Sequence, residues 1–129
     1  MKAYLLLFLA PYFLATVCSE DDPPVVNTEM IIQNESSVNL IFVTVESNEI
    51  DVAIGAQQYI IGGQDASEAV VPSSLETFES IVLFIRDSTG SLVEVYRQAP
   101  IDDSQWTFND LGEFEKQYIL VLRDDDLNL

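Results

Sequence analysis

The sequence of 129 residues predicts an all-β protein: a single antiparallel β-sandwich or small barrel that follows an N-terminal signal peptide. The apolar clusters after residue 28 are short and rich in β-branched and aromatic residues, as strands are. Turn-forming residues separate these clusters at roughly ten-residue intervals, which is typical of sandwiches and barrels. No segment after the signal keeps a helical period for three turns, so helices are not expected in the domain.

The first half of the expected domain contains three strand candidates. They are Met30-Ile31-Ile32, the apolar stretch 38–45, and the alternating residues Ile50, Val52 and Ile54. Alternation of apolar and polar residues is the period of a half-buried strand. The turn signal Asn34-Glu35-Ser36-Ser37 separates the first two candidates, and Gly55 ends the third.

A long loop is expected near the middle of the chain. The short apolar segment Tyr59-Ile60-Ile61 leads into Gly62-Gly63, a pair of residues that usually stops a strand. Residues 62–77 contain Pro72 and several small polar residues. They therefore form the longest predicted loop.

The second half contains the clearest hairpin. The run 81–85 is entirely apolar, which predicts a central strand. The stretch 92–96 returns after the turn sequence Asp87-Ser88-Thr89-Gly90. Two further strands are expected at 106–108 and 118–122, and Arg123 with the aspartates behind it ends the last one.

Residues 1–17 have the features of a secretory signal peptide. Lys2 supplies the positive charge at the start, and the apolar run that follows it carries no charge. This run is shorter than the roughly 20 residues of a membrane-spanning helix. An uncleaved anchor helix or a buried core helix is the alternative. Residues 18–28 then form an acidic and proline-containing spacer, which leaves 29–129 as the β domain.

The only cysteine, Cys18, lies at the junction between the signal and the acidic spacer, and it has no second cysteine with which to form a disulfide. This placement resembles a bacterial lipoprotein, whose junction cysteine is diacylated and becomes the first residue of the mature chain. The resemblance implies attachment to a membrane through covalent lipid. Ala15-Thr16-Val17 differ from the usual lipobox. Ordinary secretion, with cleavage after Ser19, is therefore the alternative.

The residues that follow the cysteine, Ser19-Glu20-Asp21-Asp22, resemble the acidic export tag of Bacteroidota surface lipoproteins. That resemblance implies transport to the outer face of the outer membrane. A solvated acidic linker is the alternative interpretation.

The order of motifs in the domain also resembles a group of small Bacteroidota lipoproteins. The matching pieces are Asn34-Glu35-Ser36, Ala53-Ile54-Gly55, Ser80-Ile81-Val82-Leu83-Phe84, Tyr118-Ile119-Leu120-Val121 and Asp124-Asp125-Asp126-Leu127. Ala53 stands where the group usually has proline. The group has no assigned activity, so the resemblance implies a localisation and a β fold but no catalytic role.

Composition excludes several classes of function. Five Lys and Arg residues against 22 Asp and Glu residues give a net charge of −17, which argues against nucleic acid as a partner. The same charge argues against electrostatic docking onto anionic lipid. The chain has no histidine, so it has no His-based triad, no thiol–imidazole pair and no Cys/His zinc site.

Carboxylates are the remaining side chains that could act in catalysis or bind a metal, but their pattern in the sequence gives weak support for either role. The groups Asp102-Asp103, Asp110 and Asp124-Asp125-Asp126 offer oxygen ligands to Ca²⁺, but solvated turns and an acidic tail explain them better. Two carboxylates about 5–10 Å apart could run glycoside hydrolysis, and with 22 acids some pair meets that distance by chance. We therefore expect no enzymatic activity, no metal and no cofactor. A small carboxylate-dependent enzyme such as a glycoside hydrolase is the alternative.

Two further features suggest contacts with sugars. Trp106 and Tyr96 are candidates for a glycan-binding platform, in which an aromatic ring stacks on a pyranose. The alternative is that Trp106 and Phe108 fill the core. Asp87-Ser88-Thr89 resembles the O-glycosylation acceptor of Bacteroidota, with Ser88 as the modified residue, and an ordinary turn is the alternative.

Together these features predict a lipid-anchored lipoprotein of the outer membrane or cell surface that acts as a binding or structural module. A protein or a glycan is a candidate partner, and the sequence identifies neither. A surface position for Trp106 beside a groove would favour glycan, whereas burial of Trp106 would favour a protein partner or a structural role.

Overall fold

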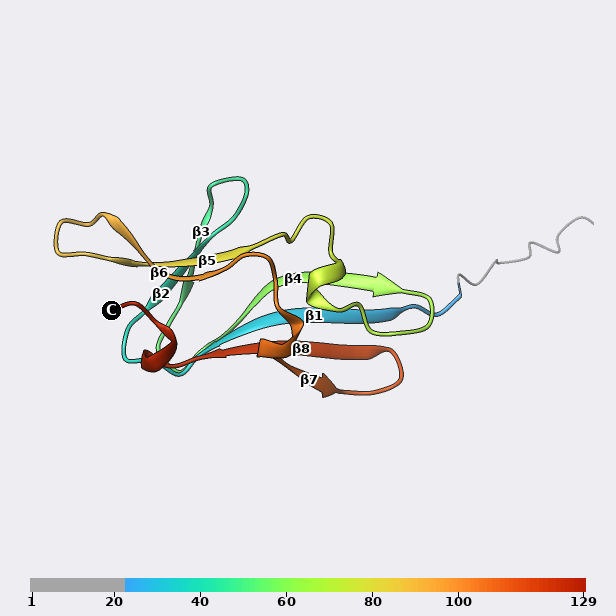
Figure 1. Cartoon of the computed structure of the whole chain (residues 1–129). Coiled ribbons are helices and arrows are strands. Elements are labelled where there is room, and N and C mark those ends of the chain that lie inside the picture. The colour runs from blue at the N-terminus through green and yellow to red at the C-terminus, as the bar shows by residue number, and fades with distance from the viewer. Residues whose placement is uncertain (1–22) are drawn as a thin grey trace, which may run out of the picture.

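The computed structural model describes residues 23–129 and shows two four-stranded sheets (Figure 1). The signal peptide, Cys18 and the tag Ser19-Glu20-Asp21-Asp22 lie outside the described residues. The first sheet has the order β4 (Gln57–Asp65), β1 (Val26–Asn34), β8 (Glu115–Leu122), β7 (Trp106–Asp110). The second has the order β3 (Glu49–Val52), β2 (Leu40–Val43), β5 (Ile81–Arg86), β6 (Leu92–Gln98).

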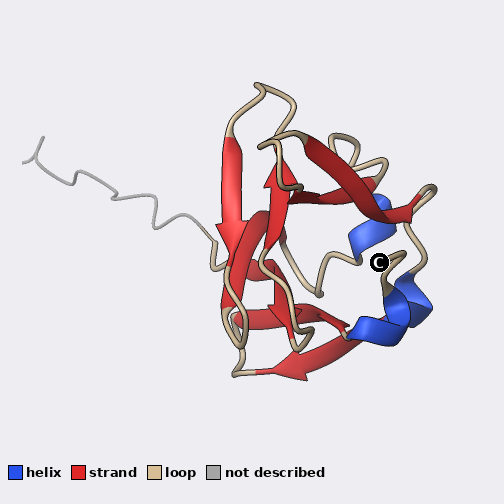
Figure 2. Ribbon diagram, turned by 90° about the vertical axis from the view of Figure 1, so that its left-hand side faces the viewer, coloured by secondary structure: helices blue, strands red, loops and turns tan. Residues whose placement is uncertain are grey.

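The all-β prediction is confirmed, and the two separate sheets form a sandwich rather than a small barrel. Helical geometry within residues 23–129 is confined to short 3-10 turns (Figure 2). They are Pro72–Ser74, Asp103–Gln105 and Asp124–Asp126.

One strand pairing differs from the antiparallel expectation. β1 and β8 are parallel, with Asn27 beside Glu115 and Asn34 beside Leu122. Parallel neighbours need a long connection, and here the chain between these strands builds the whole second sheet and both edges of the first. The first and last strands therefore meet at the centre of the first sheet, where no local turn signal could have placed them.

The core lies between the two sheets. From the first sheet, Met30, Ile32, Leu120 and Leu122 point inward and are at most 2% exposed. The second sheet contributes Leu40, Val52, Ile81, Leu83 and Val95. Alternate residues of a strand face opposite sides, so the apolar alternation seen in the sequence becomes the inner surface of each sheet.

The hairpin predicted at 81–85 and 92–96 is confirmed as the antiparallel pair β5 and β6, and β5 lies inside its sheet as expected. Two boundaries differ from prediction. β1 begins at Val26, inside the expected spacer 18–28, because Val26 and Thr28 face the core and are 5% and 1% exposed. Ile54 lies beyond β3 and is 56% exposed, because the chain turns after Val52.

The prediction that Gly62-Gly63 stops a strand is wrong. Both glycines lie inside β4, in register with Glu29 and Thr28 of β1. The following segment folds back over the inner side of this strand. A Cβ atom at Gly63 would lie 2.9 Å from Cγ1 of Val70 and 3.0 Å from Cδ2 of Leu75. Here glycine gives the covering loop room to pack against the strand.

Replacing Gly63 with alanine is therefore expected to destabilise the domain by about 1–3 kcal/mol, because the added methyl group overlaps the side chains of Val70 and Leu75. Urea denaturation measures the change in midpoint. The matched control is Gly62→Ala, whose Cβ meets a backbone oxygen and the end of an exposed tyrosine side chain, both at 3.1 Å. The control should lose less stability. Equal midpoints for Gly63→Ala and the unchanged protein would contradict this account of the loop.

Candidate functional site

The outer face of the first sheet carries an unusual set of side chains for so acidic a protein. Strand register places uncharged amides and one aromatic ring at outward positions on neighbouring strands. We call this surface the amide face and define it by Asn27, Glu29, Gln33, Gln57, Tyr59, Gln64, Asn109 and Gln117. All of these residues are exposed except Gln33 and Gln117, which are half-buried.

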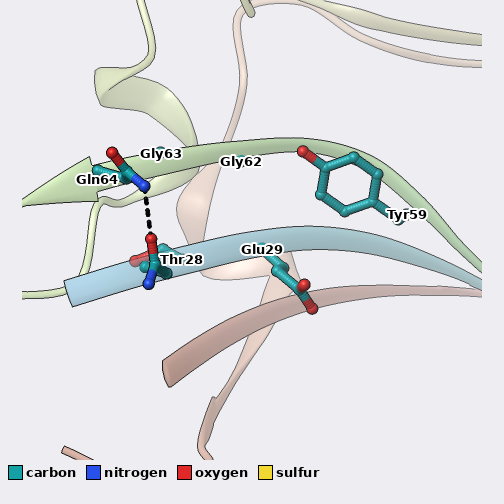
Figure 3. Close-up of a pocket in the computed structure, with 7 residues that line it drawn as sticks. Thr28, Glu29, Tyr59, Gly62, Gly63 and Gln64 are labelled. Atoms are coloured by element: carbon teal, nitrogen blue, oxygen red, sulfur yellow. Dashed lines mark hydrogen bonds between the residues drawn. The ribbon is translucent and has the colours of Figure 1, made fainter. Parts of the chain in front are cut away.

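Hydrogen bonds between strands hold the amides in place. Gln64 Nε2 donates to Asn27 Oδ1 at 2.7 Å, and Figure 3 draws this bond as a dashed line from Gln64. Gln57 Nε2 donates to Gln33 Oε1 at 2.9 Å. A primary amide has both an NH₂ donor and a carbonyl acceptor. A side chain that uses one of these groups in a hydrogen bond to its neighbour therefore still has the other available for a ligand.

The same arrangement continues across β1 to β8. Gln117 Nε2 donates to Glu29 Oε2 at 3.1 Å, which orients the carboxylate of Glu29 along the face. Glu29 and Gly62 are direct neighbours in the β1–β4 register. The face therefore extends over at least three strands of the sheet.

Tyr59 provides the aromatic ring of this face. Its side chain is 52% exposed, and the hydroxyl end lies over the bare backbone of Gly62. A Cβ at Gly62 would lie 3.1 Å from the Tyr59 hydroxyl oxygen and 3.7 Å from its Cε2. Figure 3 shows the ring alongside β4, directed toward Gly62. Glycine at this position lets the ring lie along the sheet surface with much of its area accessible to solvent.

An open groove of about 660 Å³ lies beside the ring. Its lining consists of Asn27, Thr28, Glu29, Tyr59, Gly62, Gly63 and Gln64. The two glycines form a floor without side chains, and polar groups of β1 and β4 border it. The groove thus combines an aromatic surface, space beside it, and hydrogen-bonding groups at its edges.

Charges are sparse on this face. Among the outward strand positions of β4, β1, β8 and β7, Glu29 and Glu115 are the charged residues. Each basic residue of the described chain is in an ion pair. The pairs are Arg86 with Glu49, Arg97 with Glu94, Lys116 with Asp110, and Arg123 with Glu35. Lys116 borders one end of the face, where it lines a second pocket with Asn27, Glu29 and Gln117, and its ammonium group donates to Asp110 and to the carbonyl of Gly112.

The structure corrects the prediction of a sugar-stacking platform at Trp106 and Tyr96. Their side chains are 6% and 8% exposed, because both point into the space between the sheets. Trp106 Nε1 donates to Gln98 Oε1 at 3.1 Å, and burial raises the pKa of the Tyr96 hydroxyl. The core interpretation holds for Trp106 but not for Phe108, which is 46% exposed.

The acidic clusters lie in turns. Asp102 accepts hydrogen bonds from the hydroxyl and the amide of Ser104, which lower the pKa of its carboxyl. Hydrogen bonds from the Lys116 ammonium and from the Gly112 amide lower the pKa of the Asp110 carboxyl. Within residues 23–129, no group of three or more Cys, His, Asp or Glu side chains has metal-binding geometry.

Ser88 lies in the turn between β5 and β6 and is exposed. Its neighbour Asp87 accepts hydrogen bonds from the backbone of Thr89 and Ser91, which shape the turn. The prediction that Ser88 is an O-glycosylation site stays a prediction.

No helix of residues 23–129 is long and apolar enough to span a membrane. Comparison of the chain with protein-family models, with curated proteins and with solved structures gave no match.

Sequence reasoning did not single out the amide face. Tyr59 stood in an expected strand, but its exposure depends on Gly62, which the pattern assigned to a loop. One signal was present: β4 contains a single charged residue, Asp65, at its end, in a chain with 22 acidic residues. A long uncharged polar strand in such a chain indicates a surface with a specific role.

Proposed function

We propose that this chain is a membrane-anchored binding module that holds its ligand on the amide face. The observation that carries the proposal is the ordered set of amides around the exposed ring of Tyr59. Side chains that are already fixed by neighbours lose little rotamer freedom when a ligand binds, so pre-organisation of this kind supports affinity. An ordinary solvated surface of an acidic protein would carry mobile charged side chains instead.

The anchor of the proposal is a lipid on Cys18, and the tag Ser19-Glu20-Asp21-Asp22 directs the protein to the outer face of the outer membrane. Two acyl chains hold a protein firmly because each buried CH₂ contributes about 0.8 kcal/mol. This mode of attachment needs no basic residues, which suits a chain of net charge −17. A protein of this kind works at the cell surface or outer membrane.

The geometry of the domain agrees with a tether at its N-terminal end. The chain enters β1 beside the β7–β8 turn, where Asn27 N–H donates to the carbonyl of Phe114 at 2.8 Å. The C terminus and the β5–β6 turn lie toward the opposite end of the molecule (Figure 1). The amide face runs along the strands between these ends, so an anchored domain would present it sideways to the surroundings.

Catalysis by carboxylates is the weaker candidate. A glycosidase needs one carboxyl that stays protonated near neutral pH, and this requires a raised pKa. Hydrogen bonds lower the pKa of Asp65, Asp87 and Asp102, and each of these carboxyls is exposed to solvent. These three carboxyls are therefore unsuited to the role of the general acid.

Replacing Cys18 with alanine tests the anchor. We expect the variant to incorporate no labelled palmitate and to move almost entirely from the outer-membrane fraction to the soluble fraction, because the covalent lipid is its attachment. Val25→Ala, which lies outside the junction and the tag, is the control and should keep both the label and the membrane location. Retention of label by Cys18→Ala would refute the anchor. A wild-type protein without label, cleaved after Ser19, would establish ordinary secretion instead.

A further inference from the structure

We propose that the ligand of the amide face is a neutral glycan, one of whose pyranose rings stacks on Tyr59. This inference rests on the proposed function and names the chemical class of the ligand. Burial of Trp106, the outcome expected to favour a protein partner or a structural role, removes the platform expected there, and the exposed Tyr59 provides a different aromatic surface. Four features of the face support it: the ring, the hydrogen-bonding groups, the charge and the strand edge.

The ring and the glycine floor provide a place for a sugar. A pyranose presents C–H groups on one face, and these pack against the electron-rich face of an aromatic ring. Because Gly62 has no side chain, the Tyr59 ring can lie along the sheet surface. The accessible surface of the ring is therefore continuous with the groove. The lack of a side chain at Gly62, which faces outward beside Glu29, leaves room for the neighbouring sugar.

The amides match the hydroxyl groups of sugars. A hydroxyl both donates and accepts hydrogen bonds, and so does a primary amide. Within the described residues, Asn27 Nδ2, Gln64 Oε1 and Gln117 Oε1 make no hydrogen bond to the protein. Asn27 and Gln64 line the groove, and Gln117 lies on the next strand beside Glu29, so hydroxyls on different positions of a glycan can meet these atoms.

The length of the face suits a chain of sugars rather than a single one. From Gln57 to Gln64, β4 rises about 23 Å at roughly 3.3 Å per residue. Hydrogen-bonded amide pairs lie near both ends of this stretch, and Tyr59 lies between them. The face therefore accommodates an oligosaccharide laid along the strands.

Charge selects a neutral glycan over an acidic one. The chain carries a net charge of −17, and no basic residue of the described part lies among the outward positions of this face. A uronic-acid or sulfated polymer would meet repulsion, because Lys116, the cation that borders the face, is already paired with Asp110. The Glu29 carboxylate can accept hydrogen bonds from the hydroxyl groups of a neutral sugar, so the ligand does not have to carry a positive charge.

A peptide strand is the competing ligand, because β4 is the edge of its sheet. The register of β4 shifts between Met30 and Ile31 of its partner, which leaves Ile60 as an extra residue in a β-bulge. Bulges on edge strands interrupt the regular ladder that an incoming strand needs. The bulge at the edge of β4 thus disfavours a peptide that would add as a further strand through backbone hydrogen bonds. A sugar that contacts the side chains of the face needs no such regular ladder.

The test uses the intact lipoprotein in nanodiscs of zwitterionic lipid. Isothermal titration measures binding of neutral hexasaccharides of glucose, mannose, xylose and galactose, of a hexamer of galacturonic acid, and of an extended lysine-rich peptide. We expect at least one neutral hexasaccharide to bind and the galacturonic acid hexamer not to bind. Tyr59→Ala should weaken binding about tenfold or more through loss of the stacking surface.

Matched variants locate the site. Gly62→Ala displaces the Tyr59 ring and should weaken binding, as should Gln117→Ala. Asn48→Ala, an exposed amide in the β2–β3 turn, and Trp106→Phe, in the core, should leave affinity unchanged. Circular dichroism confirms that each variant is folded.

The outcomes separate this inference from the proposed function. If no neutral hexasaccharide binds, or if Tyr59→Ala binds as tightly as the unchanged protein, the glycan inference is overturned. Binding of the peptide instead, with sensitivity to substitutions in β4, would overturn the ligand class and keep the binding module. Failure of the Cys18 experiment would remove the anchor and leave the glycan site standing.

Discussion

Asn34→Ala is expected to lower the free energy of unfolding by about 3–5 kcal/mol, one of the largest losses that a single substitution in this domain can cause. Asn34 is fully buried at the end of β1. Its Nδ2 donates to the carbonyls of Val38 and Val52, both at 2.8 Å. Its Oδ1 accepts from the amide and the hydroxyl of Ser36, at 3.0 Å and 2.6 Å.

Two of these hydrogen bonds join the end of β1 to Val38, which precedes β2, and to Val52, which ends β3; the other two fix the turn at Ser36. Alanine leaves the Val52 carbonyl and the Ser36 amide without these partners, whereas the Val38 carbonyl keeps a hydrogen bond from Ser36 Oγ at 3.1 Å. Each buried unsatisfied group costs about 1–3 kcal/mol. Asn34→Asp keeps the shape but removes both donors, so it should also be strongly destabilising at neutral pH.

Urea denaturation followed by fluorescence of Trp106, the only tryptophan, measures the loss. Asn39→Ala is the matched control, because Asn39 is exposed and its Oδ1 accepts one hydrogen bond, from Ile54 N–H at 3.0 Å. We expect the control to lose about 1 kcal/mol or less. Similar losses at both positions would show that the buried network does not hold the sheets together.

Trp106→Ala should destabilise the domain by about 3–5 kcal/mol, because it opens a large cavity between the sheets. The indole meets Phe78 edge to face, with ring centroids 6.0 Å apart. It also bonds Gln98, which is 5% exposed and whose Nε2 donates to the Tyr96 hydroxyl at 3.2 Å. Removing the indole therefore disturbs both packing and a buried polar chain.

Trp106→Phe separates these two contributions. Phenylalanine keeps most of the packing and loses the N–H donor, while Gln98 Oε1 still accepts from the amide of Asp102 at 3.2 Å. We expect a loss of about 1 kcal/mol for this variant. Thermal unfolding followed by circular dichroism suits both variants, since they lack the tryptophan signal.

Phe108→Ala on the same strand is the control for burial. Phe108 is 46% exposed and packs against Tyr118 with centroids 5.2 Å apart, so its removal should cost less than half as much as Trp106→Ala. Equal losses for the two variants would contradict the assignment of Trp106 to the core and Phe108 to the surface.

Local patterns predicted the elements whose partners are close in sequence. The β5–β6 hairpin follows from an apolar run, a turn signal and a second run, and the structure pairs Ile81 with Gln98 and Arg86 with Leu92 as that order requires. Turn geometry brings such strands together without reference to the rest of the chain.

Patterns failed where a residue's role depends on distant neighbours. Gly62 and Gly63 are strong breakers in isolation, but a loop packed on one side and the Tyr59 ring on the other make them suitable for an edge strand. Asn34 looked like part of a turn, and only the approach of Val38 and Val52 makes it a buried link between sheets.

The exposure of aromatic residues shows the same limit. Trp106 and Tyr59 both stand in strands at the edges of one sheet. Trp106 points toward the second sheet and is covered by it, whereas Tyr59 points away from the core. A single strand has two faces, and the sequence of that strand alone does not say which one meets the other sheet.

By itself, the sequence determined the all-β class, the strands with local partners and the exclusion of histidine-based chemistry, because these depend on composition and short-range periodicity. The tertiary structure decided which strands meet, which aromatic ring is exposed and where uncharged amides collect. The parallel β1–β8 pairing joins the two ends of the domain, and it places Gln117 beside Glu29 on the amide face. Gln117 and Glu29 are 88 residues apart in the sequence, and strands that far apart pair only when the rest of the chain has folded between them.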